Sequence, residues 1–218
     1  MNHLDNFNQS EYGFFALRHG QSKANVAQSP NSNTPGIIIS NPEVGTKKYG
    51  LSEEGKRQVA ASITAAKEQR ILTPDTFIYS SDFLRTVETA QIAKEILNAR
   101  MTIFTELLRE RNFGMFEGLD SGNYELVWDI DKTYADENAS EVETINSVLE
   151  RTTRLIARII KARHPNTKKR ANILLVSHGD ALQILETGFR KMDPRLHRSL
   201  EPLKTAELRQ LKLASKVA

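Results

Sequence analysis

The chain contains no cysteine among its 218 residues. This absence excludes disulfide bonds, thiolate nucleophiles and cysteine-based zinc sites. Long apolar runs are also missing, because the longest ones, near 37–39 and 173–176, fall far short of the roughly 20 residues of a membrane-spanning helix. The first ten residues are polar and lack the apolar centre of a secretion signal. We therefore expect a soluble, cytoplasmic protein with no membrane partner.

A strong excess of either charge is lacking too, since 30 lysine and arginine residues face 27 aspartate and glutamate residues, for a net charge of +3. This balance suits an anionic small-molecule substrate without requiring one. The densest basic cluster, Lys168-Lys169-Arg170, lies between Pro165 and a predicted strand. No aromatic residue lies within it to stack on bases. We interpret the cluster as a solvated loop and expect no nucleic-acid partner.

Length and composition indicate a single domain over residues 1–218. A chain of this size can bury a substantial core, and its hydrophobic fraction of 39% lies well above that of disordered proteins. Two segments interrupt the regular pattern, and we predict loop or cap insertions at 27–50 and 115–140. The first is rich in Asn, Ser, Pro and Gly, and such a long loop in a compact domain is usually functional or mobile.

Strand and helix patterns alternate along the rest of the chain. Short apolar segments indicate strands, and segments with apolar residues at helical spacing indicate helices. The predicted strands are 12–17, 76–80, 101–105, 171–177 and an edge strand at 206–213. The predicted helices are 52–70, 82–98, 143–163 and 181–189. This alternation predicts an α/β protein: a three-layer α/β/α sandwich with a mostly parallel central sheet and helices on both faces.

Two of these strands end in a histidine followed by glycine. Arg18-His19-Gly20 follows the first strand, and His178-Gly179 follows the apolar run at 171–177. Parallel strands present their carboxyl ends at one edge of a sheet, where ligands of open α/β folds bind. An isolated histidine is usually structural, but two in matched positions indicate a site. Each also precedes a turn or helix start with free backbone N–H groups for an anion.

Arginines and a glutamate in comparable positions complete the chemistry of phosphoryl transfer. That reaction needs a neutral imidazole, fixed positive charge and a proton donor for the leaving oxygen. Arg18 adjoins His19, and Arg85 lies in the first turn after the strand at 76–80. Glu110 follows a further strand and can donate a proton if burial or a neighbouring phosphate raises its pKa.

The order of these motifs resembles the histidine phosphatase superfamily, which has the phosphoglycerate mutase-like fold, from Phe14 to about Leu211. Arg18-His19-Gly20-Gln21-Ser22-x-x-Asn25 is similar to the segment around the phosphorylated histidine of the family. Four further segments match in family order: Gly50-Leu51-Ser52-x-x-Gly55-x-x-Gln58, Ser80-Ser81-Asp82-x-x-Arg85-Thr86, Leu108-x-Glu110 with Gly114-x-x-Glu117-Gly118, and Val176-Ser177-His178-Gly179.

The resemblance implies a role for each matched residue. His19 would be the nucleophile, and Glu110 would act first as acid and then as base. The groups implied to bind the phosphoryl group are those of Arg18, Asn25, Arg85, His178 and Gly179, with Asn25 either a ligand or an orienting residue. No metal or other cofactor is implied, because the arginines and the second histidine neutralise the phosphate charge. For His19 to attack, we predict that its other ring N–H bonds a carbonyl near Gly20.

The implied activity is hydrolysis of a small phosphorylated molecule through a phosphohistidine intermediate. A phosphoglycerate mutase-type transfer is the alternative, because Glu110-Arg111-Asn112-Phe113-Gly114 resembles the mutase segment. In that reading Arg111 contacts a substrate carboxylate; otherwise it is a surface arginine. Glu117-Gly118 follows the phosphatase pattern and the insertion typical of mutases is missing, which favours hydrolysis. A non-catalytic binding or scaffold protein of the same fold is a third alternative, and a homodimer is compatible with the sequence.

Other residues carry weaker signals. The aromatic residues Phe113, Phe116 and Trp128 either line a lid over the substrate or pack in the core. The arginines and lysines of the helix at 143–163 lie opposite its apolar side, which indicates a solvated face. We assign no role to the remaining histidines, His3, His164 and His197.

Overall fold

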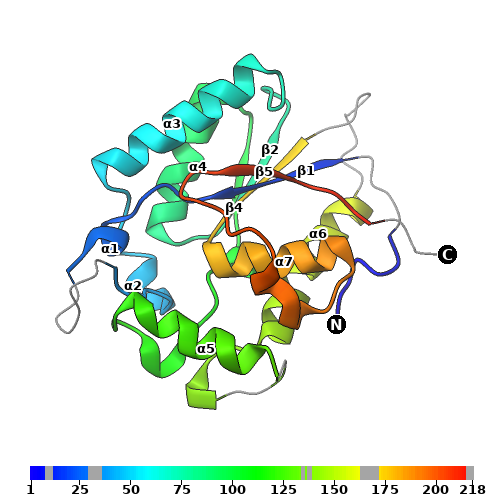
Figure 1. The fold of residues 1–218 in the computed structure, drawn as a ribbon. Coiled ribbons are helices and arrows are strands. Elements are labelled where there is room, and N and C mark those ends of the chain that lie inside the picture. Colours follow the sequence, from blue (N-terminus) through cyan, green and yellow to red (C-terminus); the bar gives the residue numbers. More distant parts are fainter. Residues whose placement is uncertain (8–11, 29–35, 134–135, 137–138, 163–171, 215–218) are drawn as a thin grey trace.

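A five-stranded sheet forms the centre of the computed structural model, which describes residues 1–7, 12–28, 36–133, 136, 139–162 and 172–214 (Figure 1). The strand order is β3-β2-β4-β1-β5. The strands are β1 (Gly13–Arg18), β2 (Phe77–Ser80), β3 (Thr102–Phe104), β4 (Asn172–Ser177) and β5 (Leu208–Leu211). All neighbours run parallel except β5, which pairs antiparallel with β1 at the edge. The predicted mostly parallel sheet and its antiparallel edge strand are confirmed.

Side chains of the central strands alternate between two hydrophobic layers. In β1, Phe14 and Ala16 join the cluster of α6 and α7, whereas Phe15 and Leu17 join that of α3 and α4. Successive residues of a strand point to opposite faces, so a continuous apolar run is buried on both sides. Helices α3 (Glu53–Glu68) and α4 (Leu84–Leu97) cover one face, and α6 (Ile145–Ala162) and α7 (Gly179–Arg190) cover the other (Figure 1). The fold is therefore the predicted three-layer α/β/α sandwich.

A local signal explains where α3 begins. Ser52 caps α3 as predicted, and its side chain accepts a hydrogen bond from the backbone N–H of Gly55. The apolar positions predicted for α6, among them Ile145, Val148 and Ile159, are all buried. Two single-turn helices, α1 (Lys23–Val26) and α2 (Pro42–Gly45), lie in the connection between β1 and α3. The predicted loop at 27–50 thus contains α2, and its residues 29–35 lie outside the described part of the chain.

The segment between β3 and α6 forms a second small layer, and we refer to residues 113–143 as the cap. Sequence reasoning treated this region as irregular, but it contains α5 (Tyr124–Asp131) together with four short 3-10 helices: η1 (Glu106–Leu108), η2 (Gly114–Phe116), η3 (Ser121–Asn123) and η4 (Ala139–Glu141). A core of its own holds it, made by Ile38, Phe113, Val127 and Val142. Phe113 is fully buried there, so it packs in a core, as one of the two sequence readings had it.

After α7 the chain passes through η5 (Pro194–Ser199) to β5. No helix in the described part of the chain is both long and apolar enough to cross a membrane. The basic cluster Lys168-Lys169-Arg170 and the histidine at position 164 lie outside the described residues.

Candidate active site

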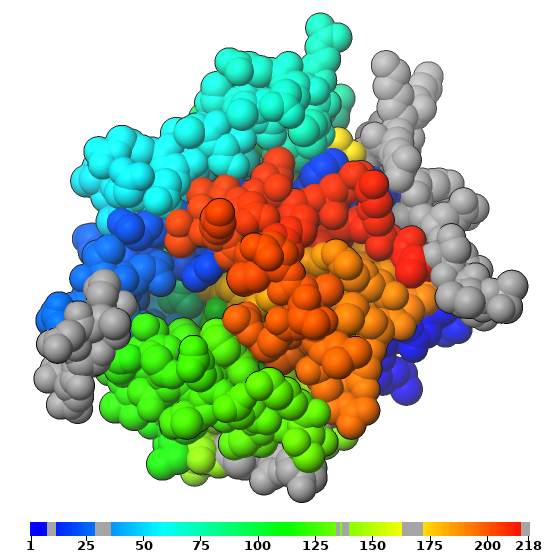
Figure 2. All heavy atoms as spheres, viewed as in Figure 1, coloured from blue at the N-terminus to red at the C-terminus, as the bar shows by residue number. Residues whose placement is uncertain are grey.

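The carboxyl ends of β1 and β4 bring the two predicted histidines together. Arg18 pairs with Ser177 at the last position of the parallel register, so the next residues, His19 and His178, leave the sheet side by side. Their ring centroids lie 5.3 Å apart. Figure 2 shows a recess on this side of the molecule, bordered by the blue segment that follows β1, the green cap and the orange C-terminal part. The topology therefore confirms that both strands end at one edge of the sheet.

Glycines allow the chain to turn sharply after His19. A Cβ on Gly20 would lie 2.4 Å from the carbonyl oxygen of Gly55, and a Cβ on Gly55 would lie 2.0 Å from that of Gln21. Both distances are far below van der Waals contact, so only glycine fits at either position. This close approach seats the turn after β1 directly on the first turn of α3.

His19 is held in the tautomer that a nucleophile needs. Its Nδ1 lies 2.7 Å from the carbonyl oxygen of Gly20, which can only accept, so Nδ1 carries the proton and Nε2 keeps its lone pair. The predicted contact near Gly20 is thereby confirmed. Burial, followed by the positive charges of Arg85 and Arg18, holds the pKa of His19 well below its usual range. The imidazole is therefore neutral at physiological pH.

His178 is also neutral and faces the same arginine. Its Nδ1 accepts a hydrogen bond of 3.1 Å from Nε of Arg85, which leaves the proton on Nε2, 3.0 Å from Oγ of Ser81. Burial and the charge of Arg85 keep the pKa of His178 well below the usual histidine value. In this form Nδ1 is an acceptor, and His178 becomes a donor toward an anion only when it gains a proton or turns its ring.

Arg85 and Arg18 leave buried donors without partners at this edge. Nε of Arg85 is shared between the two histidines, Nη2 donates to the carbonyl of Ile39 at 3.0 Å, and Nη1 is buried without a partner. Arg18 donates from Nη1 to the carbonyl of Leu203 at 2.7 Å, while its Nε is buried and unpaired. Unsatisfied buried donors are costly. Their presence on two neighbouring cations fits a site that receives an anion.

The carboxyl group of Glu110 is almost fully buried and lies against the first turn of α7. Its Oε1 accepts hydrogen bonds of 3.0 Å from the backbone N–H groups of Ala181 and Arg111. Burial, followed by the negative charge of Asp180, raises the pKa of Glu110 above its usual value. A carboxyl group with a raised pKa holds its proton to higher pH than an exposed glutamate does, which suits a general acid.

The two remaining predicted phosphate contacts differ in character. Oδ1 of Asn25 accepts from both the backbone N–H and Oγ of Ser22 at 2.9 Å, which closes a capping box at α1. These contacts hold Asn25 in place through Oδ1, and both roles predicted for it, phosphate ligand and orienting residue, stay predictions. Gly179 opens α7 beside Arg18, and a Cβ there would lie 3.4 Å from Cζ of the guanidinium.

One of the two roles expected of Arg111 is wrong, and its buried ion pairs disfavour the other, a contact with a substrate carboxylate. Its side chain is 1% exposed, so it is not a surface arginine. Nη1 and Nη2 form a bidentate pair with Asp131 at 2.6 and 2.8 Å, Nη1 also lies 3.4 Å from Asp180, and Nε donates to the carbonyl of Glu143. With these bonds made inside the protein, Arg111 ties the cap to α7 and does not reach the histidines.

The sequence gives no role to His197 or Tyr124, two of the side chains around Asp180, and offers a lid or core position for a third, Trp128. His197, which sequence reasoning left without a role, is fully buried, with Nε2 lying 3.4 Å from Oδ1 of Asp180 and 3.8 Å from Oδ2 of Asp131. Trp128 donates from Nε1 to Oδ1 of Asp180 at 2.9 Å and stacks on Tyr124. Burial and the negative charge of Glu110 raise the pKa of Tyr124. Sequence periodicity carries no signal for such contacts between distant elements.

The position of Arg151 also contradicts the prediction made for it from the sequence. It was placed on a solvated face of α6, yet its side chain is only 14% exposed and bonds to the backbone around Glu110. By contrast, Arg154 and Arg158 on the same helix are exposed as expected. Among the described residues, no group of three or more His, Asp or Glu side chains is arranged to hold a metal ion.

Comparisons with known proteins concern the chain as a whole. The model of the histidine phosphatase superfamily (branch 1) matches residues 14–217. A solved structure of mycobacterial glucosyl-3-phosphoglycerate phosphatase with VO3 aligns with a TM-score of 0.71 at 22% identity, over 91% of this chain and 90% of that chain. A structure titled mycobacterial hydrolase 2 aligns with a TM-score of 0.70 at 23% identity, over 91% and 81% of the two chains.

A mutant phosphoserine phosphatase from Entamoeba histolytica, solved with phosphoserine, aligns with a TM-score of 0.66 at 19% identity, over 90% of this chain and 88% of that chain. At these identities the solved structures show a shared fold. A comparison with curated protein sequences finds no match to this chain.

Proposed function

The chain belongs to the histidine phosphatase superfamily, and on that premise we propose that it hydrolyses small phosphomonoesters through a phosphohistidine on His19, without a metal ion. One observation carries the proposal: a neutral His19 whose Nε2 lone pair faces buried, partly unsatisfied arginine donors. An anion in that place satisfies the donors and presents its phosphorus to the nitrogen that can attack it.

The reaction proceeds by two displacements. Nε2 of His19 attacks phosphorus while Arg18 and Arg85 hold the phosphoryl oxygens, and Glu110 protonates the departing alkoxide. Glu110, now a carboxylate, then accepts a proton from water as that water attacks the phosphohistidine, which releases inorganic phosphate and restores His19. Once it gains a proton or turns its ring, His178 can donate a hydrogen bond to a phosphoryl oxygen beside Arg85.

The raised pKa of Glu110 supports its part in both steps. Burial disfavours the charged form of the carboxyl group and so favours the protonated form that the first step requires. Once it has given up that proton, the same environment makes the carboxylate a stronger base for the second step.

A mutase reaction has less support, because the residue that would hold a substrate carboxylate, Arg111, is bonded to Asp131 and Asp180. The similar phosphatases act on glucosyl-3-phosphoglycerate and on phosphoserine by their titles, so a first substrate panel includes phosphoserine, 3-phosphoglycerate and sugar phosphates.

The test compares the wild type with His19→Ala on p-nitrophenyl phosphate and on the panel, with EDTA present throughout. We expect turnover that vanadate inhibits in the wild type and none in a folded His19→Ala protein. Retained activity of that variant overturns the proposal, and an inactive wild type favours a binding or scaffold role. Transfer of phosphate between the 2 and 3 positions of phosphoglycerate, in place of release, marks a mutase.

A further inference from the structure

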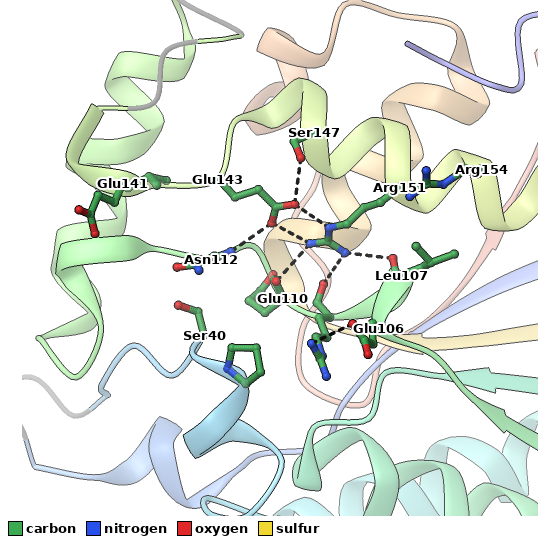
Figure 3. Close-up of a pocket in the computed structure, with 13 residues that line it drawn as sticks. Ser40, Glu106, Leu107, Glu110, Asn112, Glu141, Glu143, Ser147, Arg151 and Arg154 are labelled. Atoms are coloured by element: carbon green, nitrogen blue, oxygen red, sulfur yellow. Dashed lines mark hydrogen bonds and ion pairs between the residues drawn. The ribbon is translucent and has the colours of Figure 1, made fainter.

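Arg151 donates hydrogen bonds to the backbone segment that carries Glu110. Its Nη1 donates to the carbonyl oxygens of Leu107 and Arg109 at 3.0 and 2.9 Å, and its Nη2 donates to the carbonyl oxygen of Glu110 at 3.1 Å (Figure 3). The fourth carbonyl of this stretch, that of Leu108, accepts from Oγ of Ser177 at 2.6 Å. All four carbonyls from Leu107 to Glu110 are therefore satisfied by side chains from other elements.

Glu143 fixes the orientation of that guanidinium group. Its carboxylate pairs with Nε and Nη2 of Arg151 at 2.8 and 3.0 Å, in the two-pronged geometry that arginine and carboxylate favour. The same carboxylate also accepts from the backbone N–H of Asn112 at 3.2 Å and from Oγ of Ser147 at 3.3 Å. We refer to Arg151 and Glu143 together as the clamp. It links α6 to the backbone that precedes and follows Glu110 in the chain.

The clamp contacts the backbone of Glu110, whereas α7 contacts its carboxyl group. The carboxyl group bonds to backbone N–H groups of Ala181 and Arg111, so a shift of the Glu110 backbone would pull Oε1 away from them. Neither Arg151 nor Glu143 is part of the hydrophobic core. Their side chains are 14% and 18% exposed, and together with Glu110 they line a pocket of about 460 Å³ (Figure 3).

A partly exposed ion pair contributes little to stability by itself. Most hydrogen bonds of the clamp instead go to the backbone of residues 107–112, the short segment that carries the Glu110 side chain. We propose that Arg151, oriented by Glu143, is a positioning residue that holds Glu110 at the distance and angle needed to protonate the leaving alcohol. This inference rests on the proposed function, and it adds a residue that does not itself touch the substrate.

If Arg151 positions Glu110, the rate loss caused by substituting Arg151 depends on the leaving group. An alkoxide must be protonated as it departs, whereas p-nitrophenolate leaves without a proton. A displaced Glu110 therefore slows transfer from an alkyl phosphate and hardly affects transfer from p-nitrophenyl phosphate. General loss of structure would slow transfer from both esters to the same degree.

The experiment measures the single-turnover rate of His19 phosphorylation with glycerol phosphate and with p-nitrophenyl phosphate. Arg151→Lys keeps the charge but loses the planar fork. We expect the alkyl ester rate to fall about 10- to 100-fold, in line with the cost of a misplaced catalytic group, and the aryl ester rate to fall less than about threefold. Equal losses with both esters overturn the inference.

Two further variants and one control complete the test. Glu143→Gln weakens the same fork while it leaves Arg151 in place, so it must show the same ester preference, and it serves if Arg151→Lys does not fold. Arg154→Lys, which lines the same pocket without bonding to the Glu110 segment, must leave both rates unchanged. The double variant Glu110→Gln with Arg151→Lys must be no slower on the alkyl ester than Glu110→Gln alone, because Arg151 acts through Glu110.

Additive losses in the double variant show that Arg151 acts independently of Glu110, and they contradict the inference. Failure of the proposed function is recognised separately. If His19→Ala retains turnover, the phosphohistidine mechanism itself is wrong, whereas an inactive His19→Ala with equal losses in Arg151→Lys refutes the positioning role alone.

Discussion

Nε of Arg85 lies 3.2 Å from Nε2 of His19, so a permanent cation donates to the nitrogen that would attack phosphorus. The same Nε–H reaches Nδ1 of His178 at 3.1 Å. Under the proposed mechanism, this N–H must bond to the incoming phosphoryl group instead of the two histidines before His19 can attack. Arg85, together with burial, keeps the histidines neutral. Under the proposed mechanism it also holds the phosphoryl oxygens once substrate binds.

From this relationship we predict that Arg85→Gln weakens the binding of inorganic phosphate at least about tenfold, which corresponds to about 1.4 kcal/mol. Titration calorimetry measures the affinity directly. Arg100→Gln is the control, because the Arg100 side chain is 85% exposed and its partner is the exposed Asp75. Equal phosphate affinity in wild type and Arg85→Gln would show that the anion binds elsewhere.

The pH dependence of turnover should follow Glu110 on the alkaline side. The pKa of Glu110 is raised, so its proton is lost as pH increases through that value, and kcat/KM for an alkyl phosphate falls there. The pKa of His19 is held well below its usual value of about 6.5, so the acid limb that protonation of the nucleophile causes lies well below that pH. Profiles at constant ionic strength check both limbs, and Glu110→Gln must abolish the alkaline one.

A stability measurement tests the neutral state of His19 without reference to activity. Because its pKa is lower in the folded than in the unfolded protein, the folded state binds fewer protons, and the free energy of unfolding decreases as pH falls below about 6.5. Urea titrations should show a shallower decrease for His19→Asn, by up to about 1.4 kcal/mol per pH unit. An unchanged slope would mean that His19 is charged in the folded protein.

Arg111→Ala should destabilise the fold by about 3–5 kcal/mol, because it leaves the buried carboxylates of Asp131 and Asp180 without their cation. Chemical denaturation gives the value. Lys132→Ala is the control, since its pair with Asp129 is 64% and 69% exposed and should contribute little. Unchanged stability of Arg111→Ala, with a higher KM for carboxylate-bearing esters, would restore the substrate contact expected from the sequence.

Gly55→Ala should lower stability by about 1–3 kcal/mol, although alanine is the better helix former by about 1 kcal/mol. The reason is steric, because the new Cβ would lie 2.0 Å from the carbonyl oxygen of Gln21 and push apart α3 and the turn after His19. Thermal unfolding and kcat should both decrease. Thr64→Ala, at an exposed position of α3, should be neutral or slightly stabilising, and the same result for Gly55→Ala would contradict the close approach.

The sequence by itself determined the layers and the residues gathered at the sheet edge. Apolar runs at strand length, helical spacing in 143–163 and histidines placed directly after two strands are local patterns, and a parallel register carries them to a common edge. That topology accounts for the positions of His19, His178, Arg85 and Glu110. The tautomer of His19 was predictable for a different reason: a nucleophile must keep its lone pair, and the partner of its other nitrogen is the adjacent residue Gly20.

Only the tertiary structure decided what the other charged and aromatic side chains do. Arg111, Arg151 and His197 are ordinary polar residues in sequence, and each becomes buried or bonded because an element distant in the chain packs over it. The helix Tyr124–Asp131 is short and gains its stability from a core shared with Ile38 and Phe113. Local sequence encodes the period of an element, but the partner of a buried charge depends on which segments meet in three dimensions, and desolvation makes that partner decisive.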